Sequence, residues 1–294
     1  MTSVEYIEQP TVRTEYVDAR GLVPVGRRPS LHDYIADLWR RRSFIVADSR
    51  AKSATSNKDY LLGNLWLVGR PLLDGLTYFV IFGLIFGARD GVENFVGFLL
   101  IGIFLFGYTS RCLTGGLGSI ASGKNLIRTF AFPRAVVPLA STLREMLSTF
   151  PVIVTMIVLI LVIPPHARLS IWWLLFPAVF LLQTLFNIGV GLYAARFGAL
   201  VPDAKVAISF ISRLWMYGSG VMFSIEQISD GHPLVMAISQ LNPLYCVLEL
   251  SRDLLLYEKP GDATLWVVLT AWAVVTPVMG FIFFWHGEEH YGRE

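Results

Sequence analysis

Residues 118–125 of this chain come close to a phosphate-binding motif. They differ by one position from the loop G-x-x-x-x-G-K-[ST], with Gly118, Gly123 and Lys124 in place. That loop needs a hydroxyl at its last position to bind Mg²⁺, and Asn125 supplies an amide instead. The loop also follows a buried strand, whereas here an apolar stretch long enough to cross a bilayer comes first. The segment therefore does not predict a nucleotide site.

A second motif lies near the end of the sequence. Residues 286–290 match the zinc signature H-x-x-E-H, through His286, Glu289 and His290. Only four residues follow that could supply another ligand, so we predict a solvated tail rather than a metal site. The sequence contains no Ser/His/Asp constellation and no carboxylate pair in a plausible pocket. We therefore expect a protein that is not an enzyme and holds no metal or cofactor of its own.

Long apolar stretches separate these motifs. Mean hydropathy is +0.56, 54% of the residues are hydrophobic and 16% are charged, against about 25% charged in soluble domains. A helix needs about 20 apolar residues to cross a hydrocarbon core of about 30 Å. We predict an all-α polytopic membrane protein with six transmembrane helices, at residues 66–87, 95–115, 139–163, 171–195, 206–224 and 264–285.

The positions of Lys and Arg predict the orientation. The first 65 residues contain ten of them, and the segment between the second and third windows contains Lys124, Arg128 and Arg134 without an acid. The stretch 225–263 has only two, Arg252 and Lys259, against six acids. Because positive residues accumulate on the cytoplasmic side, we place both termini in the cytoplasm. The predicted parts are a cytoplasmic tail (1–65), a transmembrane domain (66–286) and a short cytoplasmic tail (287–294).

An amphipathic helix is predicted before the first span. Ser30 can cap its start, and Leu31, Ile35, Leu38 and Trp39 recur at helical spacing. A short helix with an apolar face, a tryptophan and an arginine cluster is typical of a helix lying on the membrane surface. The alternative is a soluble helix packed on a partner. The residues expected to contact lipid headgroups are Trp39, Arg40, Arg41 and Arg42.

The region 225–263 is too long for a simple loop and too broken for a span. Its two apolar pieces, 233–241 and 244–256, are separated by Asn242 and Pro243. Neither reaches about 20 residues, so we predict re-entrant helices that dip into the outer leaflet between spans five and six. Surface amphipathic helices are the alternative. The residues of this predicted outer gate are Asn242, Pro243, Tyr245 and Arg252.

The segment 119–138 predicts a contact with a soluble partner. It combines apolar side chains with basic ones, a composition suited to a protein interface. The alternative is a basic loop that only sets the topology. The candidate contact residues are Lys124, Ile127, Arg128, Phe130, Phe132, Pro133 and Arg134.

Aromatic residues make up 13% of the chain, and sugars stack on aromatic faces. Rings in the first, second and fifth windows therefore suit a pathway for a neutral polymer. The alternative is that they are ordinary rings of lipid interfaces and membrane cores. The candidate channel-lining residues are Tyr78, Phe82, Tyr108, Trp215 and Tyr217.

Taken in order, residues 31–286 resemble the permease subunit of ABC-2-type exporters of lipid-linked polysaccharides such as O-antigen, teichoic acid or galactan. The motifs that carry the resemblance are Tyr60 to Trp66 with Pro71, Asn125 to Arg128 with Phe132 to Pro138, and Asn242-Pro243 ahead of Arg252.

The resemblance implies a subunit of the bacterial plasma (inner) membrane that forms a channel as a homodimer. Segment 119–138 would be a coupling helix docking into a cytosolic ABC ATPase, with two ATPase subunits per dimer and ATP and Mg on those subunits. Membrane lipid and a lipid-linked polysaccharide would be further partners, and nucleic acid would not. Arg40 to Arg42 would guide the pyrophosphate headgroup of the substrate. The alternatives are an ABC-2 permease for a drug or small lipid, and a membrane enzyme that modifies polyprenyl lipids.

Overall fold

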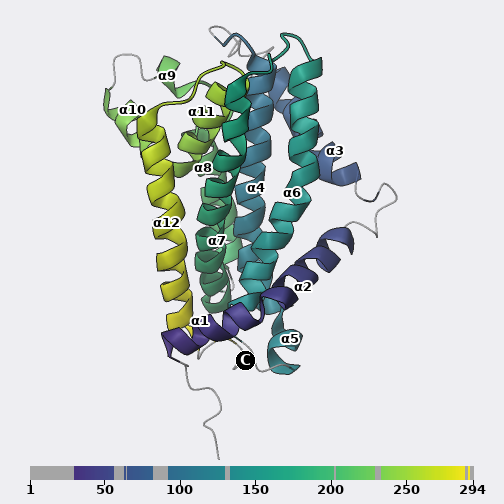
Figure 1. Ribbon diagram of the computed structural model, residues 1–294, viewed down its shortest axis with the longest axis vertical. Helices are drawn as coiled ribbons and strands as arrows, with labels where there is room; N and C mark the ends of the chain where they lie inside the picture. The colour runs from purple at the N-terminus through teal and green to yellow at the C-terminus, as the bar shows by residue number, and fades with distance from the viewer. Residues whose placement is uncertain are drawn as a thin grey trace, which may run out of the picture.

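The computed structural model describes most of the chain, and within the described residues every regular element is a helix. The helices form an upright bundle, with two helices running across its lower end (Figure 1). The described residues are 30–55, 63, 65–81, 92–129, 133–201, 203–228, 233–288 and 291.

Four helices of the described part are long and apolar enough to cross a membrane. They confirm the predicted windows 95–115, 139–163, 171–195 and 264–285. Glycines let their backbones approach, since a Cβ on Gly189 would lie 2.3 Å from the Thr276 carbonyl carbon. The four are α4 (Phe95–Ser122), α6 (Val136–Val162), α7 (Phe176–Leu200) with the short η3 (Ile171–Leu175) before it, and α12 (Ala263–His286).

The first and fifth windows correspond to shorter helices. α3 covers Leu65–Tyr78, and the rest of its window beyond residue 81 lies outside the described residues. α8 (Ala204–Gly218) has 15 residues and ends at Gly218 rather than at residue 224. The chain turns there because Gly220 adopts a positive φ of 65°, and the Asn242 amide donates to the carbonyl of Gly218 (3.2 Å). At 1.5 Å per residue α8 spans about 22 Å, less than a hydrocarbon core. Six full spans therefore stay a prediction.

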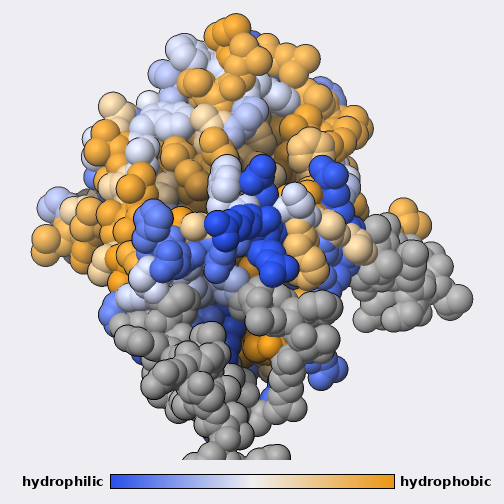
Figure 2. All heavy atoms as spheres, turned by 60° about the horizontal axis from the view of Figure 1, so that its bottom comes forward, coloured by the Kyte–Doolittle hydropathy of each residue, from blue (hydrophilic) through white to orange (hydrophobic). Residues whose placement is uncertain are grey.

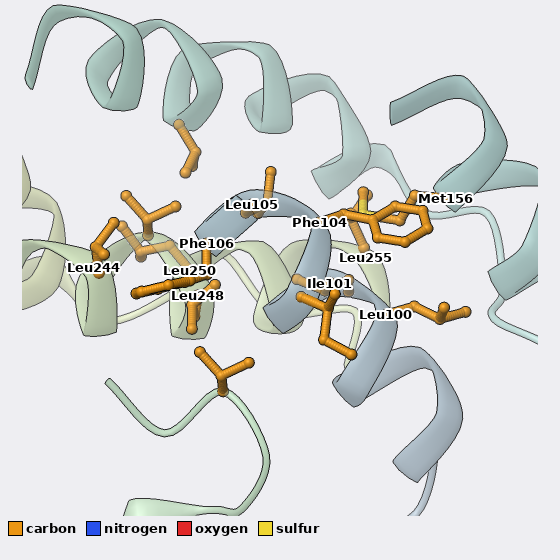
Figure 3. Close-up of a cluster of buried hydrophobic side chains, with 14 of the residues drawn as sticks. Leu100, Ile101, Phe104, Leu105, Phe106, Met156, Leu244, Leu248, Leu250 and Leu255 are labelled. Atoms are coloured by element: carbon orange, nitrogen blue, oxygen red, sulfur yellow. The ribbon is translucent and has the colours of Figure 1, made fainter. Parts of the chain in front are cut away.

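The end of the bundle that is predicted to face outward, called the outer end below, contains the predicted broken helix pair. α9 (Ile225–Ile228) precedes α10 (Pro233–Gln240) and α11 (Pro243–Leu255), and the last two meet at 91°. The break falls at Asn242 and Pro243 as predicted, with the Asn242 Oδ1 accepting from the N–H of Leu244 (3.1 Å). Figure 3 shows leucines of α11 facing α4 in the core.

The end of the bundle that is predicted to face the cytoplasm, called the cytoplasmic end below, is crossed by α1 (Leu31–Arg40) and α2 (Arg42–Thr55). The six-residue α5 (Lys124–Thr129) lies below α2 in Figure 1. Ser30 caps α1 as predicted, accepting from the N–H of Asp33 (3.2 Å). α2 packs along α6, and the Ser49 hydroxyl of α2 donates to the carbonyl of Ala140 in α6 (2.9 Å). Figure 2 shows a hydrophilic band across this end, with apolar flanks above it. The amphipathic helix therefore exists, and its place on a membrane surface stays a prediction.

Candidate functional site

Three segments that are distant in sequence meet at the cytoplasmic end of the bundle. The Tyr34 hydroxyl of α1 donates to Glu288 Oε2 (2.7 Å), just beyond α12. The N–H of Ala135 donates to the Tyr34 oxygen (3.0 Å), and the N–H of Arg134 donates to Glu288 Oε1 (3.0 Å). The Arg134 guanidinium also donates to the Glu288 carbonyl. We call Tyr34, Arg134, Ala135 and Glu288 the cytoplasmic clasp.

The clasp is shielded from water. Tyr34 has no exposed surface and Glu288 is 8% exposed. Burial raises the pKa of Glu288 above its ordinary value of 4.5, although the donors Arg134 N–H and Tyr34 O–H oppose the shift. Burial and the neighbouring Glu288 raise the pKa of Tyr34, so its hydroxyl keeps the proton that it donates. A displacement of any one segment therefore strains bonds to the other two.

The described residues after α12 pack back onto the bundle. The Tyr291 ring stacks on Phe284 with centroids 4.6 Å apart, and its hydroxyl donates to the Phe284 carbonyl (3.0 Å). Nearby, the Arg196 guanidinium lies 4.0 Å above the Phe283 ring. The prediction of a solvated tail is therefore wrong at Glu288 and Tyr291, because each finds a buried hydrogen-bond partner and Tyr291 also stacks on a ring.

The candidate coupling residues fall into two groups. Ile127 packs against the cluster that contains Tyr34 and Ile120, Pro133 is buried, and Arg134 belongs to the clasp. These three hold the segment to the bundle. Lys124 is half-buried. Phe130, Phe132 and the side chain of Arg128 lie outside the described residues. Contact with a partner stays a prediction for this segment.

The exposed side of α1 presents the predicted basic cluster. Trp39 is 68% exposed, and the Arg42 guanidinium lies 4.9 Å above its ring. Arg40 forms a solvent-exposed ion pair with Asp37 (3.2 Å), and Arg41 is exposed beside it. An exposed tryptophan among three cations can bind an anionic headgroup.

The predicted channel rings differ in exposure. Tyr108 has no exposed surface, because it lies between α4 and α7 and donates to Thr184 Oγ1 (3.1 Å). Trp215 donates to Asn242 Oδ1 (3.0 Å), so it fixes the turn after α8. Tyr217 is 43% exposed and Tyr78 is half-buried, whereas Phe82 lies outside the described residues. Tyr108 therefore packs within this chain, whereas Tyr217 and the half-buried Tyr78 and Trp215 offer surface to a channel.

The predicted outer gate is built around Arg252, which has no exposed surface. Its guanidinium donates to Glu249 Oε1 (2.7 Å) and to the Gly220 carbonyl (2.9 Å), and lies 3.3 Å from the Phe98 ring centroid. Pro243 and Tyr245 are buried beside it. A cavity of about 770 Å³ opens next to this group, and its ionisable lining is mainly acidic: Glu93, Glu226, Glu249, Asp253, Glu258 and Asp262, with His166, Arg168 and Lys259.

A bundle of membrane-length apolar helices with a broken helix pair defines an integral membrane protein. A family model described as ABC-2 type transporter matches residues 54–256, and the chain belongs to this family, as its motifs predict. It is 28% identical over 200 residues to the O-antigen export system permease protein RfbA of Klebsiella pneumoniae, covering 67% of this chain and 74% of that protein. It is 22% identical over 242 residues to the protein of the same name from Myxococcus xanthus, covering 82% and 91%.

Proposed function

We propose that this chain is the transmembrane subunit of an ATP-driven exporter that moves a lipid-linked polysaccharide across the bacterial plasma membrane. Two copies form the channel, and two cytosolic ATPase subunits bind at the coupling segments. The names of the similar proteins support the polysaccharide, and family membership supports the ATPase partner. Both termini lie in the cytoplasm, in keeping with the distribution of Lys and Arg.

The observation that carries the proposal is the cytoplasmic clasp. It joins the segment that would contact the ATPase to α1 on one side and to the end of α12 on the other. A push on residues 119–138 would therefore reach two helices of the bundle through hydrogen bonds 2.7 to 3.0 Å long. Such a rigid connection is what transmission of ATP-driven motion requires.

A pull-down in mild detergent tests the ATPase contact. The affinity-tagged chain should retain an ATP-hydrolysing subunit, and Phe130→Ala with Phe132→Ala should reduce its recovery at least about tenfold, because aromatic anchors dominate interface energies. Leu169→Ala, an exposed apolar residue in the loop after α6, is the matched control and should retain the subunit. If the wild-type chain purified alone in good yield, the proposed ATPase contact would be wrong.

A second experiment tests the substrate. Replacing Arg40, Arg41 and Arg42 by Gln should lower export of the glycan to the cell surface while the protein accumulates normally, because these cations would attract the pyrophosphate of the lipid carrier. Unchanged export at unchanged expression would remove the arginines from the proposal. Loss of drug resistance with intact surface glycan would instead favour a permease for small molecules.

A further inference from the structure

A second cavity, of about 370 Å³, lies near the cytoplasmic end between α2, the end of α4 and the first half of α6. Its volume is within the range of about 300–1,000 Å³ that is typical of small-ligand sites. Unlike the outer cavity, it has basic and hydroxyl-bearing walls. The polar lining includes Asp48, Lys52, Ser122, Asn125, Ser141 and Arg144.

The charged side chains that line this cavity are two basic residues, Lys52 and Arg144, and one acid, Asp48. Asp48 pairs with Lys52 on α2 (2.9 Å). Glu145 contacts two guanidiniums, those of Arg144 (3.2 Å) and Arg111 (3.6 Å). Basic groups therefore outnumber acidic ones in the lining, and both also have a carboxylate neighbour. The side chains of Lys52 and Arg144 are 52% and 30% exposed, so an anion that enters the cavity can reach both of them.

The position of the cavity suits a lipid headgroup. Arg144 lies about 12 Å along the axis of α6 from Val136, where that helix begins. The cavity therefore extends from the cytoplasmic surface toward the edge of the hydrocarbon core. Gly115 keeps its inner wall open, since a Cβ there would lie 3.0 Å from Ser141 Oγ and 3.8 Å from Arg144 Nη2.

The donor types match a phosphate. The guanidinium of Arg144 and the ammonium of Lys52 form charge-assisted hydrogen bonds with phosphate oxygens. Ser141 accepts a long contact from Arg144 (3.4 Å), so its own proton can be donated to a ligand. We propose that this cavity binds the phosphate group of an anionic membrane lipid, at a site separate from the exposed arginines of α1. The inference uses only the membrane placement and orientation of the proposed function.

Lipid retention tests the site. The full-length chain would be purified in mild detergent, and bound phospholipid would be measured by native mass spectrometry. Wild-type protein should retain phosphatidylglycerol in preference to phosphatidylethanolamine. Lys52→Gln with Arg144→Gln should weaken that retention at least about tenfold, since each hydrogen bond to a charged group contributes about 1.5–3 kcal/mol. Arg50→Gln, an exposed residue of the same helix, is the control for general attraction and should retain the lipid.

A steric variant guards against misfolding in the double substitution. Ser141→Leu narrows the cavity and leaves every charge in place, so it should also release the lipid from a folded protein. Equal retention by wild type, the double variant and Ser141→Leu would overturn the proposal. Because the pull-down of the ATPase is a separate measurement, the site can fail while the exporter assignment stands, and the reverse.

Competition identifies the source of the phosphate. Displacement of phosphatidylglycerol by a glycan-free polyprenyl pyrophosphate would support the site as one for the substrate carrier. If labelled phosphatidylglycerol is displaced by unlabelled phosphatidylglycerol but not by the polyprenyl pyrophosphate, the site holds a structural lipid. Displacement by inorganic phosphate with no effect of either lipid would overturn a lipid site.

Discussion

Each end of the bundle is held by one buried ionisable side chain, but the surroundings of the two differ. At the outer end, Arg252 belongs to a helix that is buried along almost its whole length and sits in the main apolar core. At the cytoplasmic end, Glu288 follows the last turn of α12 and joins segments through a few polar bonds. Opening the outer end would disrupt the main apolar core, whereas opening the clasp would break hydrogen bonds and separate only the smaller apolar cluster around Tyr34. The cytoplasmic end is therefore the end that can move at the lower free-energy cost.

Removing Arg252 should have the largest effect. Arg252→Met leaves Glu249 and the Gly220 carbonyl without their donor in a buried site, a loss of about 3–5 kcal/mol for a broken buried pair. We expect a marked fall in the melting temperature in detergent, or failure to purify as a monodisperse protein.

Arg168→Met is the control for this variant, because Arg168 is an exposed cation at the same end. It should melt like the wild type. If the two variants behaved alike, the outer end would owe its stability to apolar packing alone, and the contrast between the two ends would lose half of its basis.

The outer end could be predicted from sequence because its signals are local. Asn242 and Pro243 separate two apolar segments. An arginine such as Arg252 within an apolar segment also stands out, because burying its charge is costly in free energy. The start of α1 was equally local, since Ser30 and Asp33 lie three residues apart. The four long helices followed from hydropathy, which needs no knowledge of neighbours.

The clasp was missed because its partners are remote. Tyr34 and Glu288 are 254 residues apart, and Arg134 and Glu288 are 154 apart. A short polar tail gives no sign of burial, and the apolar spacing of Leu31, Ile35, Leu38 and Trp39 did not include Tyr34. The early end of α8 was missed for the same reason, because hydropathy cannot show that Asn242 bonds to Gly218.

Removing the Tyr34 hydroxyl should have an intermediate effect. Tyr34→Phe keeps the ring, which packs near Phe281 (5.8 Å), but leaves Glu288 Oε2 and the Ala135 N–H without this partner. Buried groups left unsatisfied cost about 1–3 kcal/mol each. We expect a smaller fall in melting temperature than for Arg252→Met.

The same variant separates stability from coupling. If the clasp transmits motion, Tyr34→Phe should retain the ATPase in a pull-down and still hydrolyse ATP, yet export less glycan per ATP. A double-mutant cycle with Glu288→Gln should show non-additive losses, because the two groups share one hydrogen bond. Additive losses with unchanged export per ATP would make the clasp a structural contact only.

The pH dependence of Glu288 should be the smallest effect. Burial raises the pKa of Glu288 in the folded protein above 4.5, so the folded state binds this proton more tightly than the unfolded state. Stability therefore falls as pH rises from about 4.5 through the folded pKa. Glu288→Gln cannot titrate, so the melting temperature of the wild type minus that of the variant should decline over this interval. A difference that instead grew with pH would mean that the donors Tyr34 and Arg134 outweigh burial and favour the carboxylate, and the clasp would then be held by charge as the outer end is.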